Sequence, residues 1–154
     1  MRGRELAAMI AALAAVACGS GDGGGEGGGG PRVVDSDERY TVTLDASPPE
    51  SADAPGELRL RVTTAGRWEI ADEAPAHLVL TSPALDFAPA ELGFEHARNL
   101  HAGGFEFVTA IRSEREGRQH ADAELRFGVC EKGIQICEVV QTELELPVVV
   151  RFAE

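Results

Sequence analysis

The chain has 154 residues, enough for one ordinary domain and a short appendage. Its 26 acidic residues against 14 basic residues give a net charge of -12. A surface this acidic repels phosphate groups, which excludes nucleic-acid binding and electrostatic attachment to anionic lipid headgroups. The sequence therefore predicts one acidic domain, together with segments that do not belong to it.

The first segment, residues 1–17, has the layout of a secretory leader. Arg2 and Arg4 precede the apolar stretch 6–16, and small residues follow it. Such a stretch is typical of a signal peptide and is too short to span a bilayer stably. The alternative is a helix of the folded domain, because Ala, Leu and Met favour helix. We predict a cleaved signal peptide over 1–17.

Cys18 follows Ala15-Val16-Ala17, which resembles a bacterial lipobox, in which the cysteine is lipidated and becomes the new amino terminus. The same three residues also fit the A-x-A site of the ordinary signal peptidase. One of only three cysteines stands at the position that lipid attachment requires. This favours a membrane anchor on Cys18, palmitate included, in the bacterial cell envelope. Gly19 stands where Asp would resemble an inner-membrane retention signal, so the outer membrane is preferred, with the domain in the periplasm or at the cell surface.

Residues 18–31 are predicted to be a tether. Glycine dominates the run from Ser20 to Gly30, which has no side chain that could join a core. Such a segment is a disordered coil, and the thirteen residues from Gly19 to Pro31 should have an r.m.s. reach of about 20 Å. The folded domain is expected over 32–154.

From Tyr40 onward, apolar and polar residues alternate with a period of two, which is typical of half-buried strands. The expected strands are 40–44, 57–63, 67–70, 77–81, 91–96, 104–112, 121–130 and 139–152. Turn signals such as Pro55-Gly56 separate them, and no segment after residue 31 has a helical period with caps. Seven or eight short strands at regular spacing predict an all-β, immunoglobulin-like antiparallel β-sandwich.

Several side chains receive a structural interpretation. Tyr40 and Trp68 are predicted to pack in the core or at its rim, and Leu92 and Phe94 to point inward. The four histidines show no metal-ligand spacing, and we expect them at the surface or packed against strands: His77, His96, His101 and His120. Asp35, Asp37 and Glu38 lack EF-hand spacing and are expected to form a solvated edge. We predict no metal and no cofactor.

Cys130 and Cys137 are separated by six residues, where one long strand ends and the next begins. Lys132-Gly133 supplies a turn, so the two thiols should flank a hairpin within bonding distance. In an oxidising envelope compartment they should form a disulfide. Strand parity places Cys130 on the face opposite Val129, so this bridge differs from the inter-sheet bridge of antibody domains. An accessible bridge over a short loop is the more easily exchanged kind.

The stretch 123–150 resembles the end of the N-terminal, immunoglobulin-like periplasmic domain of the DsbD family of thiol:disulfide interchange proteins and of small related lipoproteins. The matching residues are Phe127, Cys130, Cys137 and Pro147-Val148. The resemblance implies thiol:disulfide exchange, in which Cys137 forms mixed disulfides with a thioredoxin-like envelope partner and Cys130 resolves them. The residues alone leave an alternative open: a binding or structural module whose Cys130–Cys137 disulfide only stabilises a hairpin.

Overall fold

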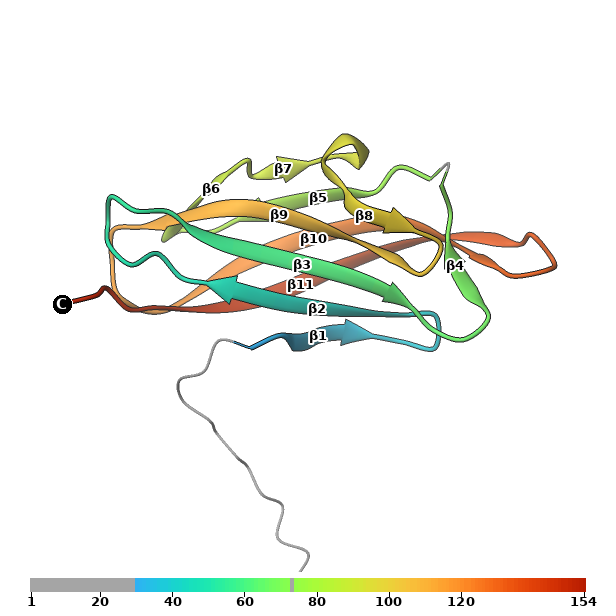
Figure 1. Ribbon diagram of the computed structural model, residues 1–154, viewed down its shortest axis with the longest axis horizontal. Helices are drawn as coiled ribbons and strands as arrows, with labels where there is room; N and C mark the ends of the chain where they lie inside the picture. The colour runs from blue at the N-terminus through green and yellow to red at the C-terminus, as the bar shows by residue number, and fades with distance from the viewer. Residues whose placement is uncertain (1–29, 73) are drawn as a thin grey trace, which may run out of the picture.

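The computed structural model describes residues 30–72 and 74–154, which form two facing antiparallel β-sheets (Figure 1). The signal peptide predicted for 1–17, the lipid site predicted at Cys18 and nearly all of the predicted tether lie outside the described residues. Within the described part of the chain, no helix has the length and apolar character needed to cross a bilayer.

The first sheet has the order β1-β2-β3-β9-β6, with β8 also paired to β9. Its strands are β1 (Arg32–Ser36), β2 (Tyr40–Ser47), β3 (Gly56–Thr64), β6 (Leu85–Ala88), β8 (Arg98–His101) and β9 (Gly104–Ser113). The second sheet has the order β11-β10-β5-β7, with β4 also paired to β10. Its strands are β4 (Trp68–Ile70), β5 (His77–Thr81), β7 (Glu91–Leu92), β10 (Gly117–Glu131) and β11 (Cys137–Val150). A single turn of 3-10 helix, η1 (Phe94–His96), follows β7.

The core lies between the sheets and follows from the period-two alternation. Leu58, Leu60 and Val62 of β3 are at most 1% exposed, because alternate residues of a strand point to one face. An aromatic cluster joins the sheets: the Phe127 ring of β10 lies edge-on to Tyr40 of β2, at 5.1 Å, and to Phe105 of β9, at 5.8 Å. The predicted immunoglobulin-like β-sandwich is confirmed, as is the burial of Tyr40 and Trp68.

Three strands were not predicted, and the strand expected over 91–96 is much shorter than predicted. The expected strand 91–96 ends at Leu92, because the chain turns at Gly93 into η1, and this leaves Phe94 42% exposed instead of inward. The unpredicted strands β1, β6 and β8 are short and lie at or near sheet edges, where the alternation of apolar residues is weak. The strand expected over 121–130 already begins at Gly117, because Gly117 pairs there with Val150.

Candidate functional site

The β10–β11 ladder positions the two cysteines. It runs through fourteen residue pairs, from Gly117 opposite Val150 to Cys130 opposite Cys137. The backbone N–H of Glu131 donates to the carbonyl of Ile136 at 2.9 Å, the pattern that flanks a non-hydrogen-bonded pair, where facing side chains approach most closely. A disulfide joins the cysteines, with 4.0 Å between their Cα atoms. The predicted disulfide is therefore present.

Both cysteines point to the outer face of the second sheet. Val129 is fully buried in the core, whereas Cys130 is half-buried and Cys137 is exposed. The bridge is thus outside the core between the sheets, as strand parity predicted. Figure 1 shows the β10–β11 hairpin projecting at the right-hand end of the domain, and the bridge closes the base of its turn. A left-handed backbone at Gly133, with φ of 86°, forms part of this turn.

The surroundings of the two sulfur atoms differ. Cys130 lies on β10, which has a neighbouring strand on each side. Cys137 of β11 pairs with Cys130 on one side, and Glu69 of β4 pairs with it on the other. The chain after β4 then crosses the outer face: Ala71 donates to the Gly128 carbonyl at 3.0 Å, and a Cβ at residue 128 would overlap Ala74. Cys137 lies on β11, which is the last strand of its sheet.

This asymmetry determines which sulfur an external thiolate can reach. A thiolate attacks in line with the S–S bond, from the side opposite the leaving sulfur. On the Cys130 side the next strand of the sheet is β4, whereas β11 has no further strand of its own sheet beyond Cys137. The geometry therefore favours attack at Cys137, with Cys130 as the leaving thiolate.

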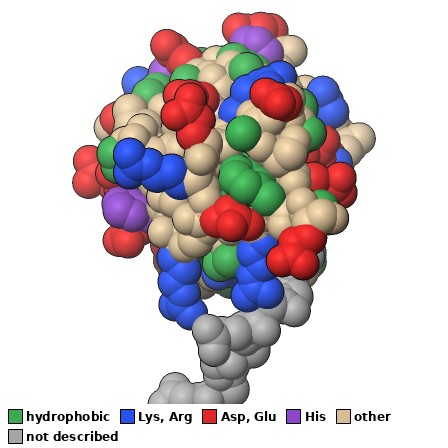
Figure 2. Space-filling model, turned by 90° about the vertical axis from the view of Figure 1, so that its left-hand side faces the viewer, with side chains coloured by type: hydrophobic (Ala, Val, Ile, Leu, Met, Phe, Trp, Pro, Cys, Tyr) green, Lys and Arg blue, Asp and Glu red, His purple; other side chains and the backbone are tan. Residues whose placement is uncertain are grey.

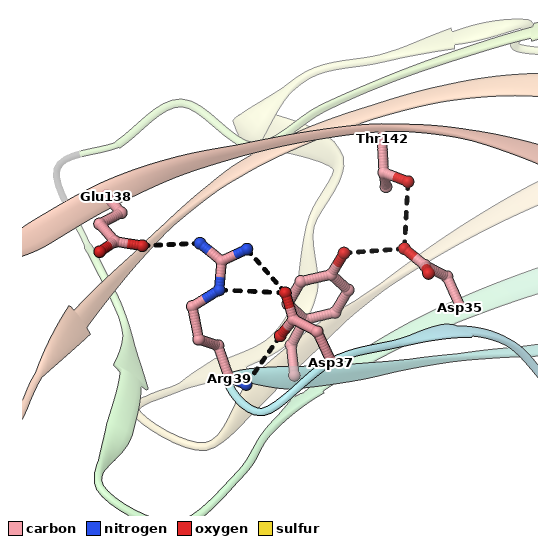
Figure 3. Close-up of polar contacts among 6 residues, drawn as sticks. Asp35, Asp37, Arg39, Glu138 and Thr142 are labelled. Carbon is pink, nitrogen blue, oxygen red and sulfur yellow. Dashed lines mark hydrogen bonds and ion pairs between the residues drawn. The ribbon is translucent and has the colours of Figure 1, made fainter.

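A polar network ties the first sheet to β11 directly beside Cys137 (Figure 3). The Arg39 guanidinium, in the β1–β2 turn, donates to Glu138 at 2.7 Å and to Asp37 at 2.6 Å. Partial burial acts to raise the pKa of Asp37, but the hydrogen bonds from Arg39 outweigh it and hold that pKa below its ordinary value of 3.8. The start of β11 is thereby fixed by the β1–β2 turn.

Asp35 makes a second link between β1 and β11. Its carboxylate accepts hydrogen bonds from the Tyr40 hydroxyl at 2.7 Å and from the Thr142 hydroxyl at 3.0 Å. Burial, reinforced by the bond to Asp35, raises the pKa of Tyr40 and keeps its phenol protonated. The prediction that Asp35 belongs to a solvated edge is wrong, because β1 folds against β11 and leaves Asp35 half-buried.

The histidines make local contacts. His96 Nδ1 accepts the Gly93 N–H at 3.0 Å, His101 Nδ1 accepts the Gly103 N–H at 2.9 Å, and His77 Nε2 lies 2.8 Å from Glu91. Over residues 30–72 and 74–154 there is no group of three or more His, Cys, Asp or Glu side chains that could hold a metal ion. The disulfide and its surroundings are accordingly the candidate site.

Comparison with known proteins assigns no function to the chain. No family model matches the sequence, and no curated protein is significantly similar to it. Among solved structures, the GAE domain of GGA2p from Saccharomyces cerevisiae matches with a TM-score of 0.41 and 10% identity, covering 80% of this chain and 99% of that one. A yeast GGA1 GAE domain gives a TM-score of 0.35 and 11% identity, covering 75% of this chain and 98% of that one.

Proposed function

We propose that this chain is a lipid-anchored bacterial envelope protein whose β-sandwich exchanges its Cys130–Cys137 disulfide with a thioredoxin-like partner. The observation that carries the proposal is the position of the bridge. It lies on an outer face, with Cys137 exposed on the last strand of its sheet. Exposed disulfides are the labile and exchanging kind, whereas structural bridges are typically protected.

The exchange proceeds in two steps. A partner thiolate attacks the Cys137 Sγ, the bond between Cys130 and Cys137 breaks, and Cys130 leaves as a thiolate that takes up a proton. The second partner thiolate then attacks the partner's own sulfur in the mixed disulfide and releases Cys137, which is also protonated. The pair gains two electrons and two protons, and the partner dithiol becomes a disulfide. The reverse steps reduce the partner.

Two variants made in the chain carrying Cys18→Ser, so that each has a single cysteine, test the reaction. Cys130→Ser leaves Cys137 free, and Cys137→Ser leaves the half-buried Cys130. Each is mixed with a thioredoxin-like protein that carries one exchanging cysteine activated as a mixed disulfide with thionitrobenzoate. We expect Cys130→Ser to form the protein–protein disulfide at least about tenfold faster. Equal rates would contradict the assignment of Cys137, and no adduct from either variant would contradict exchange.

A structural disulfide is the second candidate function. One observation favours it: the bridge joins directly opposed residues at the last pair of a fourteen-pair ladder, where it prevents fraying of the hairpin. Closing this short loop stabilises the fold by roughly 2 to 3 kcal/mol through chain entropy. In that case the domain is a binding or scaffold module, and both single-cysteine variants lose stability without forming adducts.

The membrane anchor rests on the sequence around Cys18. The proposed leader, the cysteine and the glycine-rich tether occur in the order that lipid attachment requires. Lipidation also leaves Cys130 and Cys137 as a closed pair, with no third free thiol to scramble their bridge. Mass spectrometry of the mature amino terminus tests it: we expect a diacylglyceryl-modified Cys18, and an unmodified cysteine would contradict the anchor.

A further inference from the structure

The turn of the β10–β11 hairpin carries apolar side chains that nothing in the domain covers. Ile134 is 56% exposed, Ile136 is 55% exposed, and Val139 is 57% exposed. Among the described residues these are three of seven large exposed hydrophobics, and they lie within six consecutive positions around Cys137. We call these three side chains the apolar tip.

The two glutamates of this hairpin nearest the disulfide are matched by arginines from other elements. Glu131 lies 3.1 Å from Arg67, and Glu138 lies 2.7 Å from Arg39. The chain as a whole carries a net charge of -12. Apart from the exposed Lys132 in the turn, this end offers paired charges and apolar side chains, which favour an uncharged, apolar surface over an ionic one.

The reaction geometry restricts what can occupy this end. A partner thiolate must reach Cys137 along the S–S axis, so the protein that carries it must cover the residues on either side of Cys137. Val139 shares the outer face of β11 with Cys137, whereas Ile136 stands opposite Glu131 and points to the other face, so the partner must enclose the end of the hairpin. Burial of large apolar side chains at the centre of an interface supplies binding free energy that a small thiol reagent does not gain.

We propose that the apolar tip is the docking surface for a thioredoxin-like protein whose exchanging cysteine lies in an apolar, uncharged surface. This inference rests on the proposed exchange function and adds the recognition step. A membrane surface is the competing occupant of two exposed isoleucines. The third side chain of the tip, Val139, lies beside the exposed Cys137 on the outer face, where a reacting thiolate approaches, and this favours the protein partner.

The test compares a protein reductant with a small one. The full chain carrying Cys18→Ser is reduced either by a thioredoxin-like dithiol protein or by dithiothreitol, and the rates are measured for Ile134→Ser/Ile136→Ser. The matched control is Val33→Ser/Val149→Ser, whose valines are 60% and 40% exposed away from the tip. We expect the tip variant to lower the rate with the protein about tenfold and to leave the rate with dithiothreitol within about twofold. The control should change neither rate beyond about twofold.

The contrary outcomes are distinct. If the unsubstituted chain is reduced no faster by the protein than by dithiothreitol, exchange with such a partner fails and the docking inference fails with it. If the protein reduces it faster but the tip variant reacts equally fast, exchange stands and the docking surface is wrong. If the tip variant instead loses flotation with phosphatidylcholine vesicles at an unchanged rate, the tip is a membrane contact and the proposal is overturned.

Discussion

The two ends of the β10–β11 ladder are closed in different ways. At the end opposite the disulfide, the connecting segments bond to one another: the Phe152 N–H donates to Glu116 at 2.6 Å, and the Ala153 N–H donates to the Glu50 carbonyl at 2.9 Å. Figure 2 shows acidic and basic side chains distributed over this end around a small hydrophobic area. Two backbone N–H groups that follow β11 are thus satisfied by the connecting segments.

At the disulfide end, a single covalent bond closes the hairpin, and apolar side chains remain in solvent beyond it. The aromatic cluster of Tyr40, Phe105 and Phe127 lies beneath this end and forms a rigid base for it. The exposed isoleucines and the exposed Cys137 at this end are the features on which the proposed exchange and docking rest.

The largest expected effect comes from removing the base of the disulfide end. Phe127→Ala removes a ring that is 1% exposed and contacts both sheets, so it should lower the free energy of unfolding by about 3 to 5 kcal/mol. Guanidinium chloride denaturation measures this change. Phe94→Ala is the matched control, since that ring is 42% exposed, and it should stay within about 0.5 kcal/mol. Equal losses in the free energy of unfolding for Phe127→Ala and Phe94→Ala would show that the aromatic cluster does not stabilise the domain at this end.

Removing the bridge itself should have a smaller effect. Cys130→Ser/Cys137→Ser should lower the free energy of unfolding by about 2 to 3 kcal/mol, because the unfolded chain regains the freedom of the closed loop. Far-UV circular dichroism should still report the full strand content, since the other pairs of the ladder persist. A variant that is unfolded without denaturant would contradict exchange, because the reduced form must remain folded during the reaction.

A further prediction concerns the polar link between the sheets beside Cys137. Asp35→Ala leaves the Tyr40 hydroxyl, in a residue that is 4% exposed, without its carboxylate acceptor. The free energy of unfolding should fall by about 1 to 3 kcal/mol, which thermal denaturation measures. Tyr40→Phe combined with Asp35→Ala should recover part of the loss, since no buried hydroxyl then lacks a partner. If the single and double variants are equally stable, the loss of stability does not come from the unpartnered Tyr40 hydroxyl.

The smallest effect is a dependence on pH. The pKa of Asp37 in the folded protein lies below its ordinary value of 3.8. The ionised carboxylate therefore stabilises the fold fully above pH 3.8, and this stabilisation is lost as the pH falls through the lower folded-state pKa. Because Asp37 is partly exposed, the contribution should be about 0.5 kcal/mol. Comparing Asp37→Asn with the unsubstituted chain between pH 5 and pH 2 by chemical denaturation checks it. The stability difference should vanish at the acidic limit, and a difference that grows there would contradict the assignment.

The central strands of the fold were predictable from the sequence because each buries one face. The alternation in 57–63 and 104–112 gave the positions and the inward residues of β3 and β9. The same parity rule placed Cys130 opposite Val129 and so predicted an outward bridge. Phe94 could not be placed in this way, since two residues of alternation do not distinguish a strand from the turn that follows Gly93.

The network beside Cys137 was not predictable, because it depends on contacts between distant segments. Asp35 and Thr142 are 107 positions apart, and Arg39 and Glu138 are 99 positions apart. Their meeting follows from β1 and β11 lying at adjacent edges of the two sheets, which local patterns do not encode. The exposure of Ile134 and Ile136 also required the structure, since an apolar pair in a hairpin turn could equally have folded back onto the sheet.

The reduction potential of the Cys130–Cys137 pair tests the proposed exchange most directly. The full chain carrying Cys18→Ser is equilibrated with oxidised and reduced glutathione or dithiothreitol, and the fraction of free thiol is determined by alkylation and mass spectrometry. An exchanging pair should have a potential of about -180 to -270 mV, in the range of thiol:disulfide oxidoreductases. A potential well below about -300 mV would show that the bridge only stabilises the hairpin and would contradict the proposed function.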